Sequence, residues 1–223
     1  MMRRILLINP NSSGKTTEMM ARIAAAGLPD DVQIVGATAQ NSPAMITTAV
    51  ELAASADEVV EIGVREAAGF AGIIVGAYGD PGLKTLQDHV IIPVVGICEA
   101  SMLEASEAGR RFGVATVTPD LVGSIEDAAQ RLNLSHLFSG VRLTPGDPLQ
   151  LAADPDALQA ALADAVRACL KKDRAEAVII GGGPLGQAAV ALAPLFDAPI
   201  VAPIPAAVRR LLGLMAMEAG PSA

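Results

Sequence analysis

An ordered internal repeat is the feature of this sequence that most constrains its fold. Residues 73–100 contain an apolar segment, a Gly-rich loop with proline and leucine, a helical pattern and a second apolar segment that begins with Pro93. Residues 178–207 contain the same succession, with Pro199 in the equivalent place. The glycine that ends the first apolar segment precedes this proline by 17 positions in one copy and by 18 in the other. Such a repeat predicts two similar α/β units whose loops face one another across a ligand-binding cleft.

Residues 72–83 are the most informative part of the first copy. The apolar run up to Ala77 is typical of a strand that is buried on both faces of a parallel sheet. Two glycines and a proline then require a tight turn before the next helix. Ligands in parallel α/β sheets bind beyond the carboxyl ends of the strands, so Tyr78 and Asp80 in this turn are candidate catalytic residues. A structural turn without chemistry is the alternative.

The rest of the chain alternates between strand-like and helix-like segments. Strands are predicted at residues 3–8, 32–37, 72–77, 93–97, 112–118, 139–143, 177–181 and 200–202, and longer helices at 15–26, 44–68, 155–171 and 206–217. This alternation is typical of parallel α/β sheets. We therefore predict two pseudo-symmetric parallel-sheet α/β lobes with the active-site cleft between them. Residues 1–103 with 205–223 are expected to form the first lobe, and residues 104–204 the second.

Polar and Gly-rich loops follow these strands and supply the candidate binding residues. The amide and hydroxyl groups after the first strand can bind a carboxylate or a ureide without net charge. Gly14–Lys15–Thr16 matches the second half of a phosphate-binding P-loop, but Asn9 stands where its first glycine belongs, which favours a small polar ligand. The predicted substrate-binding residues are Asn9, Asn11, Ser12, Gly79, Thr116, Thr118, Gly183, Pro184 and Leu185. We expect Asn9, Ser12, Thr118 and Gly183 to approach one shared cavity together with Tyr78.

Composition and charge argue against several classes of partner. The net charge is −8 and Lys and Arg form no stripe, which disfavours a nucleic-acid or anionic-membrane surface. No apolar run approaches the roughly 18 residues of a membrane span, and the first run is too short for a signal peptide, so we expect a cytoplasmic protein. The two cysteines and two histidines have neither disulfide nor metal-site spacing, so we predict no metal.

Four motifs give the chain a family resemblance that covers nearly its whole length. They are Asn9–Pro10–Asn11, Gly79–Asp80–Pro81–Gly82–Leu83, Pro93–Val94–Val95–Gly96–Ile97 and the Gly-rich loop from Gly181. With these motifs the chain resembles the aspartate/glutamate/hydantoin racemase superfamily, and most of all its hydantoin and allantoin racemase branch. The resemblance implies a small-molecule substrate, no cofactor, and two cysteines that flank the substrate and exchange protons on its opposite faces. Two acid/base groups on opposite faces are what inversion of a stereocentre requires. We also expect a homo-oligomer.

The chain departs from the family at both cysteine positions. One cysteine of the family lies two residues before the Gly-Asp-Pro element, where this chain has Ala77, and the other follows the glycine that ends the second-lobe strand, where it has Gly182. Neither alanine nor glycine has a side chain that can donate or accept a proton. Tyr78 and Asp80 are the candidate replacements, although Tyr78 would need a pKa below its usual value near 10 to act as a base. Cys98 is a further candidate, against its interpretation as a buried structural thiol.

Three functions follow as hypotheses. The first is a racemase-type isomerase with altered acid/base groups that acts on a small carbonyl compound, such as a hydantoin or an amino-acid derivative. The second is a lyase or hydrolase of the same superfamily, because a single-cysteine decarboxylase also belongs to it. The third is a protein that kept the cleft as a binding site and lost the chemistry.

Overall fold

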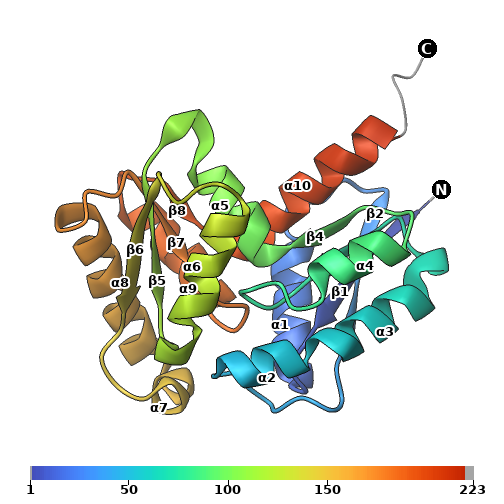
Figure 1. Cartoon of the computed structure of the whole chain (residues 1–223), viewed down its shortest axis with the longest axis horizontal. Helices are drawn as coiled ribbons and strands as arrows, with labels where there is room; N and C mark the ends of the chain where they lie inside the picture. The colour runs from blue at the N-terminus through green and yellow to red at the C-terminus, as the bar shows by residue number, and fades with distance from the viewer. Residues whose placement is uncertain (1, 219–223) are drawn as a thin grey trace.

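The computed structural model describes residues 2–218, which form two separate four-stranded sheets (Figure 1). All neighbouring strands in both sheets are parallel. The first sheet has the order β2-β1-β3-β4 and the second the order β6-β5-β7-β8, so the same topology occurs twice. The predicted two-lobed parallel α/β fold is therefore confirmed. The strands are β1 (Arg3–Asn9), β2 (Val32–Thr38), β3 (Gly72–Val75), β4 (Val94–Gly96), β5 (Phe112–Thr116), β6 (Phe138–Leu143), β7 (Ala177–Ile180) and β8 (Ile200–Val201).

Helices cover both sheets and begin where the local sequence supplies caps. In α8 the Asp154 side chain accepts a hydrogen bond from the Ala157 amide at 3.1 Å, and Pro155 occupies the first turn, as the sequence predicts. In α1 the Ser13 side chain accepts from the Thr16 amide at 3.2 Å. The helices are α1 (Gly14–Ala25), α2 (Ala49–Ala54), α3 (Ala56–Glu66), α4 (Leu83–His89), α5 (Ile97–Ala105), α6 (Val122–Arg131), α7 (Pro148–Ala153), α8 (Pro155–Lys171), α9 (Gly186–Leu192) and α10 (Pro203–Glu218).

The long helix predicted at residues 44–68 is wrong in its first part. Thr48 and Glu51 form a capping box that starts α2, because each side chain bonds the backbone of the other. Residues 44–48 are therefore a loop, and Ser55 then separates α2 from α3. The apolar periodicity of the region is helical, but it does not reveal where capping side chains interrupt the helix. The short helix α7 was not predicted either.

The last helix returns to the first lobe. α10 packs against α1, α5, β3 and β4, and it leaves the second sheet directly after β8 (Figure 1). The predicted lobe boundaries at 103/104 and 204/205 fall inside α5 and α10 and stay a prediction.

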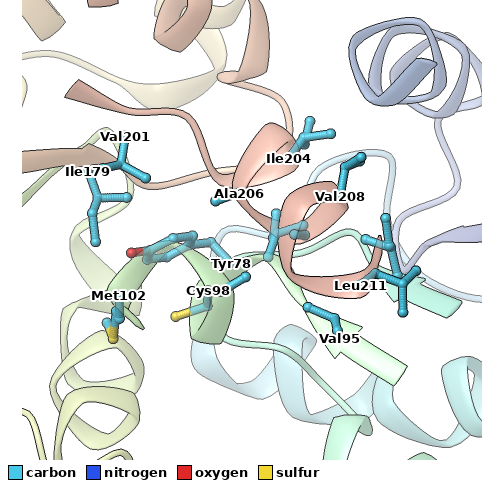
Figure 2. Close-up of a cluster of buried hydrophobic side chains, with 14 of the residues drawn as sticks. Tyr78, Val95, Cys98, Met102, Ile179, Val201, Ile204, Ala206, Val208 and Leu211 are labelled. Atoms are coloured by element: carbon cyan, nitrogen blue, oxygen red, sulfur yellow. The ribbon is translucent and has the colours of Figure 1, made fainter. Parts of the chain in front are cut away.

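One buried apolar cluster joins the two lobes. Figure 2 shows Tyr78, Cys98 and Met102 of the first half of the chain beside Ile179 and Val201 of the second sheet, with side chains of α10 next to them. Burial of each large apolar side chain contributes about 1.5–3 kcal/mol. A shared cluster of this kind keeps the carboxyl ends of the two sheets in a fixed relation.

Candidate functional site

A cavity of about 50 Å³ lies where the strand ends of the two sheets face one another. It is lined by segments that follow β1 and β3 of the first sheet and β5 and β7 of the second. One water needs about 10–15 Å³ of such space, so the cavity has room for roughly three to five waters or for a small ring. Eight predicted site residues line it together with Gly182: Asn11, Ala77, Tyr78, Thr116, Thr118, Gly183, Pro184 and Leu185.

The cavity brings together Ala77 of the first lobe and Gly182 of the second. Among its lining residues within the described chain, Tyr78 is the only one with a titratable side chain. No carboxylate, imidazole, thiol or ammonium group of the described residues lines it. A ligand here therefore meets amide, hydroxyl and apolar groups and, apart from the phenol, no side-chain acid or base.

The loops of the two lobes come into close contact at Gly76 and Gly183. A methyl group on Gly183 would overlap the carbonyl oxygen of Gly76 and would lie 3.0 Å from the sulfur of Met20. Backbone atoms cannot move aside as a side chain can, so glycine at position 183 is required by this contact between the lobes.

Asn11 supplies a hydrogen-bond donor to the cavity. Its Oδ1 accepts from Asn9 Nδ2 at 2.8 Å and from the Ser13 amide at 3.0 Å. These two bonds fix the orientation of the amide, and its Nδ2 donates to no other group of residues 2–218. Asn11 Nδ2 is thus available to a carbonyl oxygen of a ligand.

The expectation that Asn9 and Ser12 line the cavity is wrong. Asn9 is fully buried, and its Nδ2 also lies 3.0 Å from Thr17 Oγ1 while its Oδ1 accepts from the Asn11 amide. Asn9 therefore does not line the cavity but holds Asn11 in position. Ser12 lies outside the cavity, and its amide donates to the Pro43 carbonyl at 3.1 Å, which ties the loops after β1 and β2 together.

Two threonines form the polar part of the wall that belongs to the second lobe. Thr116 Oγ1 donates to the Gly181 carbonyl at 2.7 Å and so joins the ends of β5 and β7. Thr118 is buried, and its Oγ1 lies 3.5 Å from that of Thr116. Because Thr116 uses its proton on Gly181, Thr118 is the donor in this 3.5 Å contact, and it can donate to a ligand only when it gives up that long bond.

Asp80 turns away from the cavity toward the start of α5. Its two carboxylate oxygens accept from the amides of Cys98 at 2.9 Å and Glu99 at 2.7 Å. Burial raises the pKa of Asp80 to about 7, and the amides of Glu99 and Cys98 act in the opposite direction. The carboxylate therefore holds the turn after β3 against the start of α5. Gly79 belongs to this turn, with φ of +118°, and Asp80 and Gly79 are both absent from the lining of the cavity in the described chain. A catalytic role for Asp80 stays a prediction.

Tyr78 lines the cavity with part of its ring and buries the remainder between the lobes. The residue is 5% exposed, and its ring lies in the cluster that contains Cys98, Met102 and Ile179 (Figure 2). Burial raises the pKa of Tyr78 above its usual value near 10, which is the opposite of what a base requires. Within the described residues its hydroxyl has no hydrogen-bond partner. A catalytic role for Tyr78 stays a prediction that this environment disfavours.

Replacing Tyr78 with phenylalanine is expected to stabilise the protein by about 1 kcal/mol, because a buried hydroxyl without a partner costs about 1–3 kcal/mol. The measurement is urea unfolding of Tyr78→Phe, with Thr144→Val as the matched control, since the Thr144 hydroxyl is also buried without a partner but lies outside the cavity. Both variants should gain stability and keep ligand binding. Loss of stability in Tyr78→Phe alone would contradict the environment described for its hydroxyl.

Cys98 and Cys169 are both fully buried, and both lie outside the cavity lining. Burial raises the pKa of each thiol, that of Cys169 to about 12. A thiolate is therefore disfavoured at both positions.

Sequence reasoning missed the apolar wall of the cavity. Met45 and Ile46 come from the loop that was predicted as helix, and Leu52 comes from α2. The second lobe adds Val117, Leu121 and Ile125. Nothing in the local pattern distinguishes these side chains from core residues, because both are apolar and mostly buried.

Two kinds of feature are absent from the described residues. No helix there has the length and apolar character for crossing a bilayer, and no group of three or more His, Cys, Asp or Glu side chains is arranged to hold a metal ion.

Comparison with known proteins identifies relatives over almost the whole chain. A hydantoin racemase from Pseudomonas sp. (strain NS671) is 29% identical, over 92% of this chain and 83% of the relative. The solved structure of an allantoin racemase from Pseudomonas fluorescens is 28% identical, with a TM-score of 0.89 over 96% of this chain and 92% of that one. An allantoin racemase from Klebsiella pneumoniae shares the fold with a TM-score of 0.91 at 24% identity, over 97% of this chain and 89% of that one. Residues 5–211 match the Asp/Glu/Hydantoin racemase family, and the chain therefore belongs to this family.

Proposed function

We propose that this protein binds a small, uncharged carbonyl compound such as a hydantoin in the interlobe cavity and does not racemise it by exchange between two thiols. The observation that carries the proposal is the pairing of Ala77 with Gly182 across one cavity. The family resemblance puts the two proton-exchanging cysteines at these positions. A methyl group and a hydrogen leave both faces of a ligand without an acid or a base.

The groups that remain in the cavity favour binding over proton transfer. Asn11 Nδ2 is a free donor, and the Thr118 hydroxyl becomes one when it gives up its 3.5 Å contact with Thr116. Both donors suit the carbonyl oxygens of a ureide ring. Tyr78 is the one titratable group of the described lining, and its raised pKa disfavours a phenolate at neutral pH. The protein is thus best described as a racemase-type fold that keeps the ligand site. The alternative function is an isomerase that uses acid/base groups other than two thiols.

Two measurements test this proposal together. Isothermal titration calorimetry with racemic 5-substituted hydantoins should give saturable binding, and mass spectrometry in D₂O should find no deuterium entry at the α-carbon beyond that in buffer. The variant Asn11→Asp keeps the acceptor for Asn9 and Ser13 but removes the free donor, so it should weaken binding about tenfold, equivalent to about 1.4 kcal/mol. Thr118→Val provides the matched test of the second donor.

Three other outcomes would contradict this proposal. Rapid deuterium entry with the unmodified protein would overturn the binding-only function, and substitution of Tyr78, Asp80 or Cys98 would then locate the group responsible. Amino acids and substituted malonates complete the panel, because loss of CO₂ from a malonate would establish a lyase. Absence of binding to every hydantoin would refute the proposed ligand class.

A further inference from the structure

The cavity opens into a wider groove that both lobes line. The groove has a volume of about 740 Å³, whereas the cavity has about 50 Å³. Four residues line both spaces and so form the opening between them, and all four are apolar: Met45, Val117, Pro184 and Leu185. Asn11 and Thr118, which carry the hydrogen-bond donors of the cavity, do not line the groove. A group that leaves the cavity through this opening therefore passes apolar side chains.

The groove continues the apolar surface beyond the opening. The second lobe contributes Leu149 of α7 and Leu158 of α8. Leu149 is 59% exposed, so the groove contains a large apolar side chain that is left in contact with water. An apolar group of a ligand would be stabilised by covering such a side chain.

The polar side chains of the groove are absent from the opening. They line the groove but not the cavity: Lys15, Thr16, Thr47, Glu51 and Gln187. Glu51 also caps α2, because its Oε2 accepts from the amides of Thr47 at 2.8 Å and Thr48 at 3.1 Å. A short substituent attached directly to a ring in the cavity therefore lies among the four apolar residues of the opening.

We propose that the ring of the ligand fills the cavity and that an apolar substituent extends into the groove, so that the protein selects hydantoin-type rings with an alkyl substituent over those with a ureido substituent. The inference rests on the proposed function and goes beyond it by naming the substituent. Isobutyl and ureido groups have the same branched shape, so shape alone does not separate them. In the opening a ureido group loses its hydrogen bonds to water without gaining a side-chain partner, whereas burial of an isobutyl group is favourable.

Calorimetry with 5-isobutylhydantoin and 5-ureidohydantoin tests the proposal. The unmodified protein should bind the isobutyl compound at least about tenfold more tightly, because buried polar groups without partners are costly. Met45→Gln places an amide of similar length at the opening and should bring the two affinities within about threefold of each other. Met217→Gln is the matched control, because Met217 is 79% exposed on α10, outside the cavity and the groove, and this variant should keep the full preference.

Leu149→Ser tests the groove at a side chain whose exposure makes the change harmless to folding. It should weaken binding of 5-hexylhydantoin by at least about threefold and leave 5-methylhydantoin unchanged, because only the longer chain extends into the groove. Leu195→Ser is the control, since Leu195 is similarly exposed but lies outside the cavity and the groove, and it should change neither affinity.

Equal or tighter binding of the ureido compound by the unmodified protein would overturn this inference and leave the proposed function standing. A preference that Met45→Gln left unchanged would show that the substituent does not pass the opening. Equal effects of Leu149→Ser on the methyl and hexyl compounds would show that the groove does not hold the substituent. Failure of every hydantoin to bind would refute the proposed function and the inference together.

Discussion

Cysteine at both position 77 and position 182 is expected to create proton exchange at the α-carbon of a bound hydantoin, by about 10²–10⁴-fold over the unmodified protein. The two positions line one cavity from opposite lobes, so two thiols there would flank the ligand. Ala77 is not among the residues with a positive φ, so its backbone conformation is compatible with a larger side chain. Gly182 does not readily accept a side chain, because its φ is +156° and Leu185 occupies the space that the new side chain would enter. The variant Ala77→Cys/Gly182→Cys/Leu185→Ala should therefore exchange faster than the variant with the two cysteines alone.

Deuterium entry in D₂O, followed by mass spectrometry, measures the gain, and circular dichroism of a single enantiomer measures inversion. The double serine variant at the same positions is the control, because it adds similar bulk without a thiol and should show no gain. Ala77→Cys alone should allow exchange on one face without inversion. If the triple variant exchanged no faster than the serine control, the geometry inferred for the two positions would be wrong.

Gly183→Ala is expected to destabilise the protein by about 1–3 kcal/mol, as overpacking in a close contact does. The added methyl group would overlap the carbonyl oxygen of Gly76, which belongs to the other lobe. The two lobes must move apart to relieve this overlap, because the backbone at Gly76 and the backbone at Gly183 are each held within their own lobe. Separation widens the cavity between them, so ligand affinity should fall together with stability. Urea unfolding and calorimetry measure the two effects.

Gly123→Ala is the matched control for this prediction. Gly123 lies in α6, and a methyl group there would meet nothing within 4 Å. Alanine in a helix interior is favoured over glycine by about 0.8–1.0 kcal/mol, and Gly123 lies in the first turn of α6, so this variant should gain at most that stability and bind the ligand normally. A Gly183→Ala variant that behaved like Gly123→Ala would show that the two lobes do not meet at Gly76 and Gly183 in solution.

The fold follows from the sequence because its determinants are local and repeated. The apolar runs at β3 and β7, and the glycines and prolines after them, specify strand, turn and helix within each copy of the repeat. Caps such as Asp154 with Pro155 are equally local. For the same reason the loops after β1, β3, β5 and β7 could be assigned to one site. Strand ends of a parallel sheet meet at one edge whatever their side chains are.

The directions of the side chains within that site needed the tertiary structure. Asp80 bonds amides 18 and 19 residues away, and the Thr116 hydroxyl bonds a carbonyl 65 residues away. No short-range pattern encodes such contacts, so Asp80 was expected in the cleft and is found against α5.

The same distinction separates the binding residues that could be predicted from those that could not. Asn9 and Asn11 have the same chemistry in the sequence, but only Asn11 reaches the cavity, because burial turns Asn9 inward to support it. The absence of thiols at Ala77 and Gly182 is a property of the sequence alone. That Leu185 fills the space beside Gly182 depends on the path of the loop after β7, which the packing of Leu185 into the core of the second lobe decides.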